Sequence, residues 1–115
     1  MAGLAQISNG LIRINSYNNS IEYSGNGGGT WTPRSFSSEY GIPRDVISLG
    51  DDLFLCGSKG FFCSKNGGYT WTMLASSSLY GEFYRVVFDG HYFIAETSKG
   101  VHKSAGGNTW TLIHV

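Results

Sequence analysis

The sequence carries little charge, and neither sign prevails. Eight Lys and Arg residues balance eight Asp and Glu residues among 115, so the formal net charge is zero. A surface that binds nucleic acid needs an excess of basic side chains to neutralise phosphates. The composition therefore predicts no nucleic-acid partner. The abundant Gly, Ser, Asn and aromatic residues indicate a rigid, packed domain rather than a disordered segment.

Long apolar runs are also missing. No stretch approaches the ~18 apolar residues that a membrane-spanning helix needs. The first residues, MAGLAQIS, lack the basic start and the apolar core of a secretion signal. We therefore expect no membrane partner, and a location in the cytoplasm or in a virion.

Cysteine and histidine are too few and too scattered to indicate a metal site or a cofactor. A two-residue turn at Lys59-Gly60 would set Cys56 opposite Cys63 across a hairpin, but we expect free thiols, because the repeat-related positions hold other residue types. Two cysteines at this spacing lack companion metal ligands. The three histidines share no spacing typical of a metal site or a catalytic triad; they are His91, His102 and His114.

The chain contains the same phrase three times, at a period of 40 residues. The copies read SGNGGGTW, SKNGGYTW and, one residue shorter, SAGGNTW. A fixed period of this length indicates repeated supersecondary units. The motif residues are Ser24, Asn26, Thr30 and Trp31, then Ser64, Asn66, Thr70 and Trp71, then Ser104, Thr109 and Trp110.

Each unit contains four short runs of β-branched and aromatic residues bounded by Gly, Asn, Asp or Ser, which is the signature of strands joined by hairpins. Apolar residues at helical spacing are absent. We therefore expect an all-β domain of three units, 1–40, 41–80 and 81–115.

Four antiparallel strands in ~40–45 residues are typical of one β-propeller blade. Propellers usually have roughly 4–8 blades, so three blades leave two open edges that favour association. We expect two copies to form a homodimeric six-bladed ring, with blade three of one copy packed against blade one of the other. The alternatives are a fragment of a longer propeller and a monomer with a curled open sheet.

The repeated phrase resembles the Asp-box, or BNR repeat, of sialidase-type β-propellers, whose pattern is Ser-x-Asp-x-Gly-x-Thr-Trp. Asn26 and Asn66 stand where that family has Asp, and the shortened third copy has glycine there. Asn keeps the side-chain oxygen that bonds turn amides. The resemblance implies a structural box on the hairpin between the third and fourth strands, away from any active site. The alternative is that the tryptophans form a sugar-binding platform.

Catalysis is not expected. The resemblance implies that a sialidase would need an arginine triad, a tyrosine nucleophile with a glutamate partner, and an aspartic acid. The four arginines, Arg13, Arg34, Arg44 and Arg85, stand in no such motif. The candidate carboxylates for glycoside hydrolysis all lie beside turns; they are Glu39, Asp45, Glu82 and Asp89.

A second repeated segment, Ser-Ser-x-Tyr-Gly, joins the units and lies on the face expected to bind ligands. Tyrosine with small polar residues suits recognition of carbohydrates and proteins. The candidate ligand-binding residues are Glu39, Tyr40, Arg44, Tyr80, Glu82 and Arg85. The alternative is that both tyrosines fill grooves between blades.

These observations predict a non-enzymatic propeller module that binds a glycan or protein ligand, or that serves as a tail or decoration subunit of a virion. The competing hypothesis is a sialidase-like glycoside hydrolase with a site assembled across subunits. A homo-oligomer, with the dimer as the expected state, is common to both hypotheses.

Overall fold

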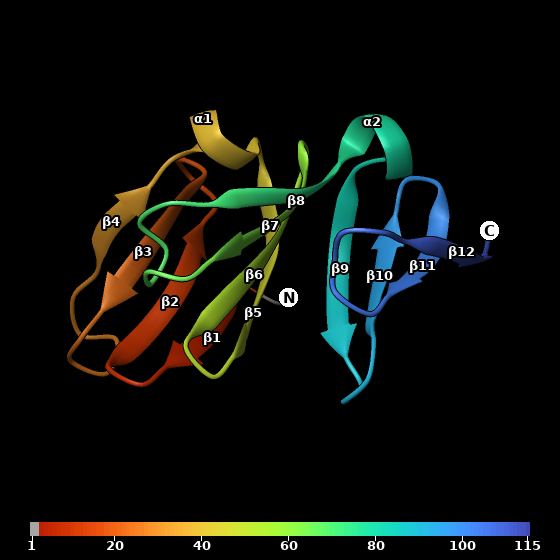
Figure 1. The fold of residues 1–115 in the computed structure, drawn as a ribbon. Helices are drawn as coiled ribbons and strands as arrows, with labels where there is room; N and C mark the ends of the chain where they lie inside the picture. The colour runs from red at the N-terminus through yellow and green to blue at the C-terminus, as the bar shows by residue number, and fades with distance from the viewer. Residues whose placement is uncertain (1–2) are drawn as a thin grey trace.

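The computed structural model describes residues 3–115 and consists of three four-stranded antiparallel sheets, which we call blades one to three (Figure 1). Blade one comprises β1 (Leu4–Ile7), β2 (Gly10–Asn15), β3 (Ser20–Ser24) and β4 (Thr32–Ser35). Blade two comprises β5 (Pro43–Leu49), β6 (Asp52–Gly57), β7 (Gly60–Ser64) and β8 (Thr72–Ser76). Blade three comprises β9 (Phe83–Phe88), β10 (Phe93–Thr97), β11 (Gly100–Ser104) and β12 (Thr111–His114).

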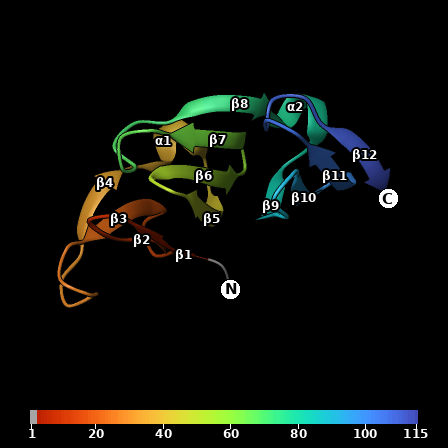
Figure 2. The same ribbon diagram turned by 60° about the horizontal axis from the view of Figure 1, so that its bottom comes forward.

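Within each blade the strands follow chain order, so every neighbour is joined by a hairpin. The first strands of consecutive blades, β1, β5 and β9, lie next to one another. The fourth strands lie on the outer side of the fan that the blades form (Figure 2). The predicted all-β class and the four-stranded units are therefore confirmed.

The connections between blades are one-turn helices, which the sequence analysis did not expect. Helix α1 (Ser37–Tyr40) follows blade one and α2 (Ser77–Tyr80) follows blade two. Four residues are too few to produce an apolar periodicity, so no pattern could reveal them. Gly41 and Gly81 end the helices at φ angles of 79° and 85°, which glycine adopts without steric cost.

The β6–β7 hairpin differs from the predicted register. Gly57 pairs with Gly60 across a two-residue turn, so Cys56 lies opposite Phe61 and Cys63 opposite Phe54. The expectation that the two cysteines face each other directly is wrong, because the turn lies one residue earlier than predicted. Both thiols are free and buried, and burial raises the pKa of the Cys56 thiol well above its usual range.

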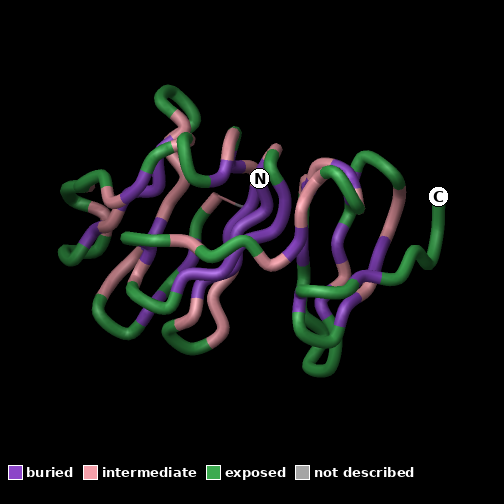
Figure 3. The backbone as a smooth tube through the Cα atoms, turned by 45° about the horizontal axis from the view of Figure 1, so that its top comes forward, coloured by how far each residue is buried: buried purple, intermediate pink, exposed green. Residues whose placement is uncertain are grey.

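The hydrophobic core lies in two seams between the blades, which appear as buried stretches in Figure 3. The seam between blades one and two is formed by Ala5, Ile7, Ile12, Ile21, Tyr40, Val46, Leu53, Leu55 and Phe62. The seam between blades two and three is formed by Phe54, Cys56, Phe61, Cys63, Ala75, Phe83, Val86, Phe93, Ala95 and Trp110. Each seam is built from alternate residues of its strands, as expected when successive side chains point to opposite faces.

Candidate functional site

The repeated motif forms the β3–β4 and β7–β8 turns through its own side chains. In blade one, the Ser24 hydroxyl accepts a hydrogen bond from the Gly28 amide at 2.9 Å, and Asn26 Oδ1 accepts one from the Thr30 amide at 2.9 Å. Asn26 Nδ2 also donates to the Thr30 hydroxyl at 3.0 Å. Asn66 makes the same bonds in blade two. Asn therefore satisfies the turn amides, as predicted for the position where the Asp-box has Asp.

The third turn is different, as its deletion predicted. Ser104 Oγ accepts from the Gly107 amide at 2.7 Å, one residue earlier than in the other blades. Trp110 donates to the Gly107 carbonyl at 2.7 Å and is buried between blades two and three. Trp71 also crosses a seam, because its indole N–H donates to the Ser35 hydroxyl at 2.9 Å.

Both one-turn helices lie at one end of the molecule (Figure 1), and each receives a lysine from a neighbouring hairpin turn. Lys59 Nζ donates to the Ser38 carbonyl at 3.0 Å, and Lys99 Nζ donates to the Leu79 carbonyl at 3.4 Å. We call this end of the molecule, formed by α1, α2 and the turns at 58–59 and 98–99, the helical-turn face. It is the face on which we expected a ligand to bind, with filling of the grooves between blades as the alternative.

The two candidate tyrosines are not equivalent. Tyr40 is fully buried, and its ring meets the Trp71 ring edge-on with 6.0 Å between centroids. Burial also raises the pKa of the Tyr40 hydroxyl. Tyr80 is partly exposed and packs on the seam between blades two and three, 5.9 Å from the His102 ring. This placement of Tyr40 matches a groove-filling role and leaves Tyr80 as the tyrosine that a ligand can reach.

Of the four charged candidate residues, Arg44 and Glu82 form an ion pair. The other two, Glu39 and Arg85, lie apart from this pair. Arg44 Nη1 lies 2.6 Å from Glu82 Oε1, so the pair bridges the starts of blades two and three. Glu39 Oε1 accepts a hydrogen bond from the Trp71 backbone amide at 3.1 Å. Arg85 is not part of this cluster and pairs with Glu96 at 2.8 Å on the face of blade three that is turned away from blade two. We call this face the outer face of blade three, and the face of blade one turned away from blade two the outer face of blade one.

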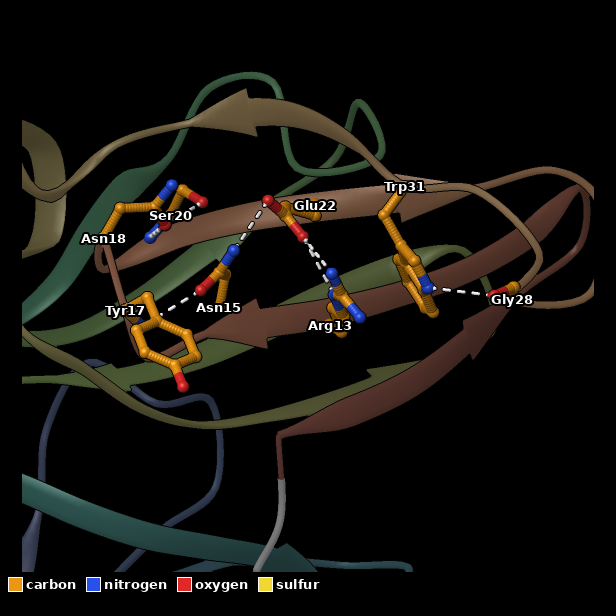
Figure 4. Close-up of polar contacts among 8 residues, drawn as sticks. All are labelled: Arg13, Asn15, Tyr17, Asn18, Ser20, Glu22, Gly28 and Trp31. Atoms are coloured by element: carbon orange, nitrogen blue, oxygen red, sulfur yellow. Dashed lines mark hydrogen bonds and ion pairs between the residues drawn. The ribbon is translucent and has the colours of Figure 1, made fainter.

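The outer face of blade one carries a polar cluster that the sequence analysis did not select (Figure 4). Glu22 Oε1 accepts from Arg13 Nε at 2.8 Å, and Glu22 Oε2 accepts from Asn15 Nδ2 at 3.0 Å. The Arg13 guanidinium lies over the Trp31 ring, 4.3 Å from its centroid. Burial alone would raise the pKa of Glu22, but the hydrogen bonds from Asn15 and Arg13 and the charge of Arg13 together lower it.

Asp45, which we expected from the sequence to lie beside a turn, is instead buried within β5 where this strand meets β9. Its Oδ2 accepts from the Val86 amide at 2.9 Å, while its Oδ1 is the one buried side-chain N or O atom without a partner in residues 3–115. Burial raises the pKa of this carboxyl. Asp45 also lines a hollow of about 330 Å³ with Arg85, Glu96 and the apolar residues Val87, Ile94 and Val101.

In the part of the chain that the structure describes, no three His, Cys, Asp or Glu side chains lie together as a metal site. The helices of the same part are each a single turn, and neither has the length or apolar character to cross a membrane.

No protein-family model and no curated protein sequence matches this chain. Solved structures do match. The GH74 enzyme of Niastella koreensis aligns with 97% of this chain at a TM-score of 0.75 and 24% identity. YCF48 from Cyanidioschyzon merolae aligns with 90% of the chain at a TM-score of 0.66 and 26% identity.

Both neighbours are β-propeller proteins. The fold is that of β-propeller blades. The chain spans 22% of the length of the GH74 enzyme and 35% of that of YCF48, so it corresponds to a part of each. At this level of identity the likeness concerns the fold, and activity is a separate question.

Proposed function

We propose that this chain is a non-enzymatic β-propeller module that binds a polar ligand, a glycan or a protein segment, on its helical-turn face. Its role is recognition or structure, for which a tail or decoration subunit of a virion is the setting that the composition favours. A second copy of the chain covers an open blade face, so the working unit is a homodimer. The six-bladed ring expected from the sequence is one arrangement of that dimer.

The observation that carries the proposal is the state of the charged residues. Arg44 and Glu82 pair with each other, and Glu39 bonds a backbone amide, so the structure does not set two carboxyl groups of this face opposite one another. Glycoside hydrolysis needs two carboxyl groups facing one scissile bond, and the candidate carboxylates are instead engaged separately. The exposed part of the face offers an aromatic ring, hydroxyls and paired charges, which suits binding.

A glycan array combined with a hydrolysis assay on the bound sugars tests this proposal. We expect binding without turnover, and weaker binding by Arg44→Ala. Lys65→Ala is the matched control, because Lys65 also forms an exposed ion pair, with Asp52, but outside the helical-turn face. Turnover that Arg44→Ala abolishes would instead establish the hydrolase hypothesis.

The homodimer is tested separately by light scattering on a sizing column. A mass near twice the 12.5 kDa of one chain supports self-association. A single-chain mass at all concentrations contradicts it without affecting the glycan result.

A further inference from the structure

The two open faces of the three-blade stack are chemically different. The outer face of blade one has Arg13, Asn15 and Glu22 at the positions that carry Leu53, Leu55 and Phe62 in blade two, forty residues later. Those three apolar residues of blade two are buried against blade one. At the positions where blade two has apolar residues that pack a seam, blade one therefore has an ion pair and an amide.

This polar set is complete in itself. Both carboxylate oxygens of Glu22 have partners, and Arg13 covers the Trp31 ring. Glu22 is already buried, and a blade packed onto this face would also remove the 39% exposed Arg13 side chain from water, at a cost in hydration that the attraction between the charges need not repay. Stacked repeat proteins likewise end in units with a polar outer face, which keeps them soluble. The part of this face around Arg13 and Glu22 therefore favours contact with water over a seam, while Leu4, paired with Arg13, is an exposed apolar residue on the same face.

The outer face of blade three is of the opposite kind. Because Val86, Phe93 and Ala95 face blade two, the alternation of the strands places Val87 and Ile94 on the outer side. The apolar residues Val87, Ile94 and Val101 line the hollow described above, and Val87 is 60% exposed. Their counterparts in blade two, Ile47, Phe54 and Phe61, are covered by blade three.

The charges around the hollow are self-complementary. Arg85 and Glu96 lie on one edge of it, Lys103 stands beside Ile94 on the same face, and Asp45 borders it. Two positive and two negative groups leave the face neutral, so two copies do not repel each other. Arg85 and Glu96 already pair within one copy, and a two-fold axis that sets the same patch against itself lets the two pairs exchange partners.

We propose that two copies of this chain associate through their blade-three outer faces about a two-fold axis, with the outer faces of blade one left in water. This inference rests on the proposed self-association and replaces the ring with an open, symmetric dimer. The stripe of Val87, Ile94 and Val101 packs against its own copy. Arg85 of each copy donates to Glu96 of the second copy and supplies a donor near the unpartnered Oδ1 of Asp45.

The size of the face sets the strength of the dimer. With strands about 4.8 Å apart and a rise of about 3.3 Å per residue, a four-stranded face five residues long covers roughly 300 Å². The side chains add accessible area to this flat projection, and a projection of this size still indicates an interface at the small end of the range, below the about 800 Å² of accessible surface per partner of a standard stable interface. We therefore expect a dimer that dissociates at micromolar concentrations.

Sedimentation velocity from about 1 µM to about 100 µM, the range of a small interface, tests the inference with two matched variants. Val87→Glu places a charge in the apolar stripe, and Leu4→Glu makes the same change at a residue of equal exposure, 61%, on the outer face of blade one. We expect Val87→Glu to remain a monomer throughout and Leu4→Glu to dimerise as the unchanged chain does.

In the six-bladed ring each seam between copies joins blade three to blade one. Val87→Glu and Leu4→Glu would then both lose the dimer, since each places a charge in a seam. Loss of the dimer in both variants overturns this inference and preserves the proposed self-association. A dimer that Val87→Glu leaves intact also overturns it. A monomeric unchanged chain overturns both proposals.

A charge exchange provides a test that does not depend on the Val87 variant. Arg85 and Glu96 form an exposed pair, so either substitution affects folding little. We expect Arg85→Glu alone and Glu96→Arg alone to dimerise at least tenfold more weakly than the unchanged chain. An equimolar mixture of the two variants should recover the dimer. One variant then carries two negative charges at positions 85 and 96 and the other carries two positive charges, so unlike charges face each other across the contact. A mixture no stronger than either variant alone overturns the two-fold contact.

Discussion

The two internal seams occupy equivalent positions of the repeat but are filled with different chemistry. Between blades one and two the core is mainly aliphatic, with Ile21 at its centre; between blades two and three it is aromatic, with Phe61 at the position forty residues later. Both residues are fully buried. The comparison shows that the repeat preserves which positions are buried, while the residues that fill them vary.

The aromatic seam is held by a cluster of ring-to-ring contacts, whereas the aliphatic seam contains the Tyr40–Trp71 contact. The Phe61 ring lies 5.5 Å from Phe83, 5.5 Å from Phe93 and 5.2 Å from Trp110, centroid to centroid. Tilted and edge-on aromatic pairs of this kind add about 0.5–1.5 kcal/mol beyond burial of their area. We therefore expect the seam between blades two and three to depend more strongly on a single side chain.

The largest expected effect is at position 61. Phe61→Ala removes the ring on which four other aromatic rings pack, and we expect the free energy of unfolding to fall by about 4 kcal/mol. Urea denaturation followed by tryptophan fluorescence measures this change. Ile21→Ala is the matched variant in the other seam and should cost about 3 kcal/mol. A larger loss for Ile21→Ala would contradict the greater dependence of the aromatic seam on one residue.

The next effect concerns the outer face of blade one, where polar residues replace a seam. Glu22→Gln leaves the Arg13 guanidinium without its carboxylate, and we expect a loss of about 1–2 kcal/mol at neutral pH. The pKa of Glu22 is lowered on folding, so its stabilisation is present above the unfolded-state pKa and is lost as pH falls through the folded-state pKa. Denaturation curves between neutral and strongly acidic pH should therefore converge for the two proteins. A constant difference between the curves would exclude this carboxylate as the cause.

A smaller effect is expected in the turns that close each blade. Asn66→Ala removes the acceptor of the Thr70 amide bond at 3.0 Å, and we expect a loss of about 1 kcal/mol in thermal unfolding. Asn66→Asp is the control, because it keeps that acceptor and should stay within about 0.5 kcal/mol of the unchanged chain. Equal losses in both variants would show that the hydrogen bond is not the determinant.

The smallest effect is expected at Asp45. Asp45→Asn keeps an oxygen for the Val86 amide and removes a carboxylate whose pKa burial raises. A raised pKa in the folded state means that the stabilisation from Asp45 is present below the unfolded-state pKa and is lost as pH rises through the folded-state pKa. Asp45→Asn should therefore match or slightly exceed the stability of the unchanged chain at neutral pH in dilute solution, measured by calorimetry. A marked loss of stability in Asp45→Asn at neutral pH would mean that the negative charge of Asp45 stabilises the contact between β5 and β9.

Much of the helical-turn face could be anticipated from the repeat, but its details could not. The repeated Ser-Ser-x-Tyr-Gly segments do lie together with the turns at 58–59 and 98–99, since each follows a blade of equal length. The sequence offers no means to tell that Tyr40 is buried while Tyr80 is partly exposed, or that Arg44 meets Glu82 and Arg85 does not. An alignment of the three repeats could have revealed the polar outer face of blade one, because Arg13 and Glu22 stand at positions that are apolar in blade two.

The sequence by itself determined the features that arise within a few residues: the strands, the glycine-rich hairpins, the box turns closed by Asn26 and Asn66, and the count of three four-stranded units. Their hydrogen bonds join residues close in the chain, so a local pattern is sufficient to specify them. Only the tertiary structure decided that Arg44 meets Glu82, that Asp45 is buried against β9, and that Tyr40 is buried against Trp71. These depend on how one blade packs on the next, where burial and desolvation act between residues about forty positions apart.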